Sequence, residues 1–266
     1  MQKLIHMIMD YAPGDLALAE VVSALTAEIP GDYHWHITSV HSFDTISTGF
    51  ALAQLGNQSR SLRPHDTVVY ANCAPRKDRS EARANNEGEG LLYGVLRSGT
   101  RILVVNSGYS MSFVRDELEE LWSVKVETGG SQFRSRDNFP IIVGQTCKGD
   151  TSFLGEQLNP AEVIPSAPSS AIGYIDSFGN LKTTLREGDA VLQNLRPGQR
   201  VGVEINGVEM TATVASGSFN VQEGDIALAP GSSGHSRKYW EIFQRGGSAW
   251  HTYKKPRPGA AISVKS

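Results

Sequence analysis

Apolar residues in the first part of the chain follow two patterns, one typical of β-strands and one typical of α-helices. Short apolar runs predict β-strands at residues 3–9, 33–40, 66–73 and 101–106. Longer runs with helical spacing predict helices at residues 15–29, 46–59, 91–99 and 112–122. In the first of these helices Leu18, Val21 and Leu25 share one face, and the preceding Asp15 stands where an N-cap belongs. Because strands alternate with helices, we expect an α/β domain with a largely parallel sheet.

The pattern changes around residues 159–170, which are rich in proline and serine and are typical of a linker. Beyond this segment the helical spacing disappears. Short β runs separated by Gly, Asn and Pro predict strands at residues 173–178, 181–185, 200–205, 208–214, 225–230 and 239–244. We therefore predict an α/β domain over residues 1–160, a linker over 161–170 and a smaller all-β, barrel-like domain over 171–266.

The composition narrows the classes of function. Of the 266 residues 39% are hydrophobic and 20% charged, and the net charge is −3, so a general nucleic-acid partner is not expected. The two cysteines, Cys73 and Cys147, form no CxxC pair or Cys/His cluster, which argues against a disulfide framework and a metal site. No apolar run approaches the ~20 residues of a membrane helix, and the N-terminus resembles a strand more than a signal peptide. We expect a cytoplasmic protein without a membrane partner.

The stretch AIGYIDSFGNLKTTL, residues 171–185, places Asp176, Phe178 and Asn180 on the corner between two predicted strands. Turn chemistry explains part of this pattern, because Asp opens turns and Gly179 can adopt a positive φ. The alternative is a ligand clamp made of an acid, an aromatic ring and an amide. The local sequence leaves both interpretations open.

A second corner, MDYAPGDLA, follows the first predicted strand. Ligands of open parallel sheets bind at the carboxyl ends of strands, and Asp10 lies at such an end. Its carboxylate can accept two hydrogen bonds from a ribose diol. An N-cap accounts for Asp15, although that side chain can also face a ligand amine. No phosphate-binding loop accompanies this corner, since neither GxGxxG nor GxxxxGK[ST] occurs in the chain.

Two further polar segments follow predicted strands or precede helices. Residues 72–83 carry four basic side chains: Arg76, Lys77, Arg79 and Arg83. This loop is either a solvated surface or a rim that faces an anion. In the segment 133–140, Ser135 lies between Arg134 and Arg136. Its hydroxyl can hold a small nucleophile, but no adjacent His/Asp pair would activate it as a nucleophile itself.

The last candidate segment is residues 231–250. Ser236 and Arg237 precede a predicted strand, and a guanidinium group binds carboxylates in a bidentate manner. After that strand, the glycine in the pair Arg245–Gly246 would allow the backbone to approach a flat ring closely. His235 is more simply explained as a turn residue than as a metal ligand.

Taken in order, six segments resemble the S-adenosylmethionine hydroxide adenosyltransferase family, which includes fluorinase and chlorinase. MDYAPGDLALAEVVSAL is similar to the family's opening Ser/Thr-Asp-Phe/Leu-Gly corner, VHSFDTISTGFALAQL to its His-containing segment, and VVNSGYSMSFV to its Asp/Asn-Asn-Gly-Leu-Leu stretch. FRSRDNF resembles Phe-His-Gly-Arg-Asp-x-Phe of the hydrolases and Phe-Tyr-Ser-Arg-Glu of fluorinase. YIDSFGNLKTTL is the most specific match, to Ile-Asp-x-Phe-Gly-Asn-x-x-Thr-Asn. SRKYWEIFQRGGSA resembles the closing Ser-x-Gly-x-Leu-x-Ile-Ala-x-x-x-Gly-Ser-Ala motif, so the resemblance covers the whole chain.

The resemblance implies a homotrimer that binds S-adenosylmethionine between the N-terminal domain of one subunit and the C-terminal β-domain of the next. It implies no cofactor or metal beside this substrate. The contacts that it assigns are Asp10 to the ribose, Asp15 and Asp176 to the methionine ammonium, Ser236 and Arg237 to the methionine carboxylate, Phe178 to the adenine face, and Asn180 with the Arg245–Gly246 backbone to the adenine edge.

The nucleophile pocket departs from the family's pattern. Where the hydrolases carry Val-Asp-Pro-Gly, this chain has Ala74 before Pro75, and Arg134 stands at the position of their histidine. Ser135 matches the serine that faces the halide in fluorinase, but the loop lacks the Tyr and Thr of that enzyme. The catalytic candidates are therefore Ser135, Arg134 and Arg79, with water as the default nucleophile and an anion as the variant.

Three functions remain open at this stage. The first is an enzyme that displaces L-methionine from the ribose 5′ carbon by aligning and desolvating a nucleophile. The second is a protein that binds S-adenosylmethionine or adenosine and has lost the chemistry. The third is a purine-nucleoside binder in which the methionine contacts are unused.

Overall fold

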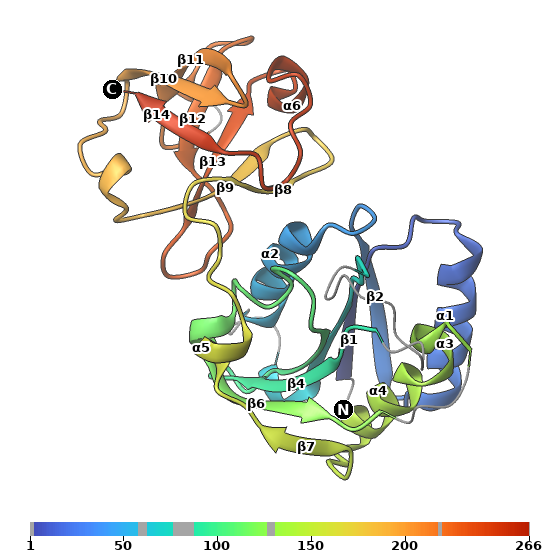
Figure 1. Cartoon of the computed structure of the whole chain (residues 1–266). Helices are drawn as coiled ribbons and strands as arrows, with labels where there is room; N and C mark the ends of the chain where they lie inside the picture. The colour runs from blue at the N-terminus through green and yellow to red at the C-terminus, as the bar shows by residue number, and fades with distance from the viewer. Residues whose placement is uncertain (1–2, 58–62, 77–87, 127–130, 218–219, 266) are drawn as a thin grey trace. The chain divides into compact units, whose positions relative to one another are not determined.

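The computed structural model describes residues 3–57, 63–76, 88–126, 131–217 and 220–265. The chain divides into two compact units, Met1–Ser166 and Ala167–Ser266, and each unit contains one seven-stranded sheet (Figure 1). The division falls within the segment 161–170, where prolines and serines interrupt the periodic pattern.

The N-terminal unit combines a mixed sheet, in the order β2-β1-β3-β5-β4-β6-β7, with short and medium helices. Its strands are β1 (Lys3–Met9), β2 (Tyr33–Ser39), β3 (Thr67–Asn72), β4 (Leu91–Leu96), β5 (Arg101–Val105), β6 (Leu118–Val124) and β7 (Leu154–Gln157). Its α-helices are α1 (Leu16–Glu28), α2 (Thr45–Gly56), α3 (Arg134–Asp137), α4 (Phe139–Lys148) and α5 (Pro160–Val163). The strands and helices predicted over residues 3–57 are confirmed, and the last two residues of the helix expected at 46–59 lie outside the described residues.

The direction of the strands changes halfway across this sheet. β2, β1, β3 and β5 are parallel, whereas β4 is antiparallel to both β5 and β6, and β7 is antiparallel to β6. The expectation of a largely parallel sheet is therefore wrong, as are the helices predicted at 91–99, which contains β4, and at 112–122, which overlaps β6. The run LLYGVL is apolar throughout, so its periodicity cannot distinguish a buried helix from a strand. Pairing along both edges of β4 decides the outcome.

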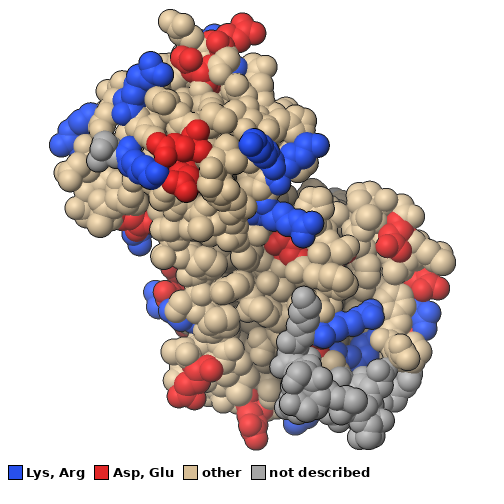
Figure 2. Space-filling model, turned by 45° about the horizontal axis from the view of Figure 1, so that its top comes forward, with Lys and Arg blue, Asp and Glu red and all other residues tan. Residues whose placement is uncertain are grey.

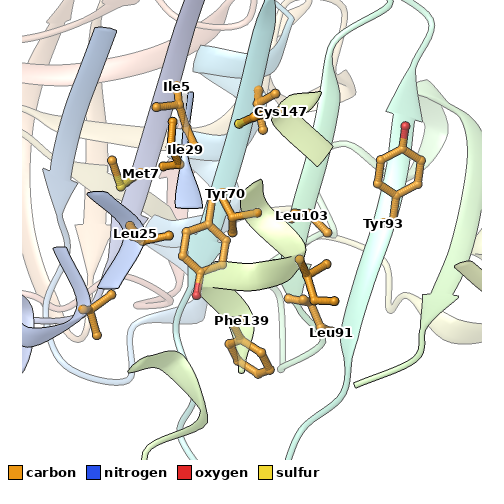
Figure 3. Packing of buried hydrophobic residues seen from close by; sticks show 14 of the residues in the cluster. Ile5, Met7, Leu25, Ile29, Tyr70, Leu91, Tyr93, Leu103, Phe139 and Cys147 are labelled. Carbon is orange, nitrogen blue, oxygen red and sulfur yellow. The ribbon is translucent and has the colours of Figure 1, made fainter. Parts of the chain in front are cut away.

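One hydrophobic cluster fills the space between this sheet and the helices α1 and α4. Figure 3 shows side chains from neighbouring strands, among them Ile5, Tyr70 and Leu103, facing Leu25 of α1 and Phe139 of α4. The helix α2 packs against β1 and β3 outside this cluster. Because both parallel strands lie between packed helices, their carboxyl ends are fixed in position.

His6 of β1 is a polar exception inside the unit. It is 7% exposed, and neither ring nitrogen has a hydrogen-bond partner within the described residues. Burial, and then the neighbouring His36, lowers its pKa to about 4. The imidazole is therefore neutral in the folded protein at neutral pH.

The C-terminal unit is a mixed sheet that curls into a half-barrel, in the order β14-β10-β11-β12-β13-β9-β8. Its strands are β8 (Ile172–Ile175), β9 (Leu181–Arg186), β10 (Arg200–Ile205), β11 (Val208–Val214), β12 (Ile226–Pro230), β13 (Tyr239–Gln244) and β14 (Ile262–Lys265), and one helix, α6 (Ala249–Thr252), follows β13. Only β11 and β12 are parallel among these pairs. Each strand predicted in this unit is present, because turn residues mark their ends, but the first, expected at 173–178, ends at Ile175, since residues 176–178 lie in a turn.

The surface and the helices agree with a chain of ordinary composition. Figure 2 shows lysines and arginines interspersed with acidic residues on the visible face rather than gathered into one basic field. Within the described residues no helix combines the length and the apolar character that crossing a bilayer demands.

Candidate functional site

The candidate site begins at the carboxyl ends of β1 and β3. In the strand order β2-β1-β3, the next strand along the chain, β2, lies on one side of β1, and the strand after it, β3, lies on the other side. Ligands of open α/β sheets bind in the crevice outside such a point, where the strand order reverses. The polar residues that follow β1 and end β3 are therefore the first candidates for ligand contacts.

Asp10 lies at this point. Its backbone N–H donates to the carbonyl oxygen of Asn72 at 3.2 Å, and its carboxylate oxygen Oδ2 accepts from the N–H of Phe43 at 3.1 Å. Burial raises the pKa of Asp10, while hydrogen bonds from Phe43, Cys73 and Ala74 lower it. The carboxylate is thus oriented by fixed donors and retains acceptor capacity for a ribose diol.

Phe43 is a second candidate that the sequence did not identify. It has a φ of 67°, which is rare for a bulky residue, and its ring is 57% exposed. Such strain costs of order 1–3 kcal/mol and clusters at functional sites. Here it accompanies the hydrogen bond from the Phe43 N–H to Asp10, and the exposed residue offers an apolar side chain.

Four polar side chains form a cluster between the end of β3 and α3: Tyr11, Tyr70, Asn72 and Ser135. Burial raises the pKa of Tyr11, and the side chains of Ser135 and Asn72 lower it, which places them beside its hydroxyl. Burial also raises the pKa of the fully buried Tyr70.

Two atoms of this cluster are buried without a hydrogen bond to any described residue, the hydroxyl of Tyr70 and the amide nitrogen Nδ2 of Asn72. Asn72 is close enough to Tyr70 to lower its pKa, but no hydrogen bond of acceptable geometry joins them. An unmade buried hydrogen bond costs about 1–3 kcal/mol. Both atoms are closed off from solvent in this structure, so an acceptor would have to enter the cluster to recover this cost.

The three expected catalytic residues have different surroundings. Ser135 is 9% exposed and joins the cluster through Tyr11. Arg134 instead donates from Nη2 to the carbonyl oxygen of Glu89 at 2.8 Å and lies over the ring of Phe139 at 5.3 Å. It therefore anchors α3 to the segment before β4. Arg79 lies outside the described residues, as does Lys77.

Asp15 has a local role. Its Oδ1 accepts from the N–H of Ala17 at 2.8 Å and caps α1. This cap accounts for Asp15 without a ligand, although its exposed carboxylate keeps further acceptor sites.

The corner of residues 176–180 is a closed turn. The carboxylate of Asp176 accepts from the N–H groups of Phe178 and Asn180 at 3.0 Å each and from Nδ2 of Asn180 at 2.9 Å. Gly179 has a φ of 79°. Turn chemistry therefore explains Asp176 and Gly179. It does not explain Phe178, which is 78% exposed and offers an apolar face at the tip.

Arg237 is already engaged within its unit. Its Nε donates to the carbonyl oxygen of Glu187 at 2.6 Å, and its Nη2 forms an ion pair with Asp189. The arginine is half exposed, and surface ion pairs contribute only about 0–1 kcal/mol. A ligand carboxylate can therefore compete with Asp189. Ser236, next to it, is exposed.

The corner and Arg237 lie at opposite ends of one strand pair. β9 and β13 are antiparallel, with Leu181 opposite Ile242 and Arg186 opposite Tyr239. Asp176 precedes the first of these pairs and Arg237 precedes the second, so roughly 16 Å of strand separates them at 3.3 Å per residue. Within one subunit, the structure does not bring Asp176 and Arg237 to the same α-amino acid group.

Arg245 and Gly246 follow β13 at the end of the strand that is nearer to the corner of residues 176–180. The N–H of Arg245 donates to Asp225 at 3.1 Å, and its carbonyl oxygen accepts from Gly224 at 2.8 Å. The backbone polar groups of Arg245 are therefore used within the unit, and Gly246 follows it with a φ of 71°. No group of three His, Cys, Asp or Glu residues that could hold a metal occurs in the described part of the chain, and His235 is an exposed turn residue with a φ of 54°.

Comparisons with known proteins define the fold and no activity. No family model matches the sequence, and no curated protein matches it. An uncharacterized conserved protein from Thermotoga maritima is similar with a TM-score of 0.78 and 17% identity, over 98% of this chain and 100% of that one. A conserved hypothetical protein from Thermus thermophilus is similar with a TM-score of 0.69 and 18% identity, over 99% and 100% of the two chains. At these identities the chain shares a mixed α/β fold with both proteins.

Proposed function

We propose that this protein binds S-adenosylmethionine and displaces L-methionine from the ribose 5′ carbon, with water as the default nucleophile and a small anion as the variant. The supporting observation is the group of polar side chains at the ends of β1 and β3. There the carboxylate of Asp10 is oriented by the N–H of the exposed residue Phe43, and the hydroxyl of Tyr70 and Nδ2 of Asn72 have no hydrogen-bond partner among the described residues.

The reaction is an in-line displacement. A bond forms between the nucleophile and the 5′ carbon, the carbon–sulfur bond breaks, and its electron pair leaves with methionine as a neutral thioether. When water is the nucleophile, one proton passes to solvent. Asp10 holds the ribose hydroxyls, and Ser135 with Tyr11 and Asn72 positions the nucleophile, so that catalysis depends on alignment and desolvation.

The C-terminal unit supplies the remaining contacts in this proposal. S-adenosylmethionine is an extended molecule with adenine at one end and an amino acid at the other. The separation of the corner from Arg237 favours adenine at Phe178, Asn180 and Gly246 and the methionine carboxylate at Ser236 and Arg237. In this arrangement the methionine ammonium binds Asp15 rather than Asp176. The ligand would be shared between the subunits of a homotrimer, which size-exclusion chromatography with light scattering tests directly.

Incubation with S-adenosylmethionine tests the activity. We expect adenosine and L-methionine in equal amounts by chromatography, and one 18O atom in the 5′ hydroxyl of adenosine when the solvent is H2 18O. Ser135→Ala should spare binding and damage turnover, while Ser152→Ala, on an exposed loop of the same unit, is the control. Equal loss of binding and turnover in Ser135→Ala would contradict its positioning role.

Binding without turnover is the second candidate function. It is favoured by the replacement of the hydrolases' acid by Ala74 and by the engagement of Arg134 with Glu89 and Phe139. Calorimetric binding of S-adenosylmethionine with no adenosine released would support it. Binding of adenosine as tight as that of S-adenosylmethionine, unchanged by Arg237→Ala, would indicate a nucleoside binder instead.

A further inference from the structure

A cleft of about 510 Å³ lies within the C-terminal unit, between the β10–β11 turn and the segment after α6. This volume is in the range of small-molecule sites. The lining residues are Asn206, Val208, Tyr253, Lys254, Lys255, Pro256, Arg257 and Ala260. The lining thus carries three positive charges and no carboxylate.

The three cations differ from others in the same unit. In the part of the chain that the structure describes, Lys254, Lys255 and Arg257 form no ion pair, whereas Lys182 and Lys265 each pair with glutamates. All three cleft cations are exposed. Like charges that are gathered on one short segment repel one another, and a bound anion would relieve this repulsion.

The backbone holds two of these lysines in an unusual conformation. Lys254 and Lys255 have φ values of 56° and 57°, a region that residues with a side chain rarely adopt. The turn is fixed, because the N–H groups of Lys254 and Lys255 donate to His251 and Trp250 at 3.0 and 2.7 Å, and the indole N–H of Trp250 donates to Pro256 at 3.0 Å. The ammonium of Lys255 also lies 5.4 Å from the Trp250 ring centroid. Glycine would avoid this strain, and strained residues of this kind cluster at ligand sites, so the side chains of these two lysines are candidates for a contact with a ligand.

We propose that this cleft binds a small phosphate-bearing molecule. Phosphate carries more than one negative charge and accepts the bidentate fork of an arginine together with lysine ammonium groups. A monocarboxylate would neutralise only one of the three cations. A net charge of −3 and the interspersed charges in Figure 2 disfavour a polynucleotide, whose binding relies on an extended basic surface.

Calorimetric titration of the full-length protein with pyrophosphate tests the proposal. Lys254→Ala/Arg257→Ala removes two cleft cations, and Arg200→Ala/Lys238→Ala removes two exposed cations of the same unit outside the cleft. We expect the native protein and the control to bind alike and the cleft variant to lose at least tenfold in affinity, with unchanged melting temperatures. No binding at millimolar pyrophosphate, or equal binding by all three proteins, would overturn the proposal.

Two additional measurements separate the alternatives. Lys254→Gly/Lys255→Gly relieves the strained backbone, so we expect a melting temperature no lower than that of the native protein together with weaker pyrophosphate binding. A fall in melting temperature with unchanged binding would assign the turn a structural role and refute the proposal. Binding of a short RNA far more tightly than pyrophosphate, abolished by the same cleft variant, would replace the small ligand with a polynucleotide and also refute it.

Discussion

The replacement Gly179→Ala tests the turn that carries Phe178. Gly179 has a φ of 79°, and its carbonyl oxygen accepts from the N–H of Trp250 at 2.9 Å, which ties the corner to α6. A Cβ atom at this position would lie 3.0 Å from Cβ of Ser248 and nearer still to its Oγ. The substitution therefore adds both backbone strain and a steric clash.

The expected loss of stability follows from these two effects. A left-handed conformation costs an L-residue about 1–2 kcal/mol, and overpacking costs about 1–3 kcal/mol. We expect Gly179→Ala to lower the free energy of unfolding by roughly 2–5 kcal/mol in total. Gly188→Ala is the matched control, because Gly188 has a φ of 90° and open space around its Cβ position, so only the strain applies.

A double-mutant cycle isolates the clash. Ser248→Ala removes the Oγ and also a cap of α6, since that Oγ accepts from the N–H of His251 at 3.3 Å. In the Ser248→Ala background, Gly179→Ala should cost about 1–2 kcal/mol less than in the native protein. Urea unfolding, followed by tryptophan fluorescence and circular dichroism, measures the loss of stability, with Trp240 and Trp250 reporting on the C-terminal unit and Trp35 and Trp122 on the N-terminal unit. A cost below about 0.5 kcal/mol for Gly179→Ala, or no coupling to Ser248, would refute the reasoning.

Three further expectations concern both units. The pKa of His6 is lowered to about 4 from an ordinary 6.5, so the native protein loses stability as the pH falls from 6.5 toward 4, because only the unfolded chain takes up a proton at this residue. In urea titrations over that interval, the free energy of unfolding of His6→Leu should therefore rise relative to that of the native protein by up to roughly 3 kcal/mol. A difference that does not change with pH would contradict this. Tyr70→Phe removes a buried hydroxyl without a partner among the described residues, so the free energy of unfolding should rise by about 1 kcal/mol while turnover slows; a fall in stability would show that the hydroxyl is satisfied. By calorimetry, Arg237→Ala should weaken S-adenosylmethionine by roughly 1.5–3 kcal/mol and leave adenosine unchanged, whereas Asp176→Ala should weaken both; equal effects of the two variants on adenosine would refute the assignment of ligand ends.

The sequence predicted the elements whose signals are local. The helix α1 has a regular apolar face and a capping Asp15, and the strands of the C-terminal unit end at Gly, Asn and Pro. β4 and β6 were missed because their identity depends on partners far away in the chain. An apolar run such as residues 91–96 becomes a strand only when β5 and β6 are present to pair with it.

The candidate site was predicted only in part for a related reason. Asp10 stood out as a lone acid at the end of an apolar strand. Tyr70 and Asn72 sit in a strand that is buried throughout, so they were counted as part of the core, although two polar groups at alternate positions were a signal. Phe43 gave no signal, because its positive φ and its contact with Asp10 arise only when the ends of β1 and β2 come together.

The change of strand direction at β4 divides the sheet into a parallel half, which carries Asp10 and Asn72, and an antiparallel outer edge. Asp10, Phe43 and Asn72 all belong to the first 76 residues and lie at the parallel half, while in the sheet β6 pairs with β4 and β7 pairs with β6. Substitutions confined to β7 can therefore alter how firmly that outer edge is held while the hydrogen bonds of Asp10 stay in place. An insertion between β6 and β7 is different, because this segment contains α3 with Ser135 and would disturb the polar cluster.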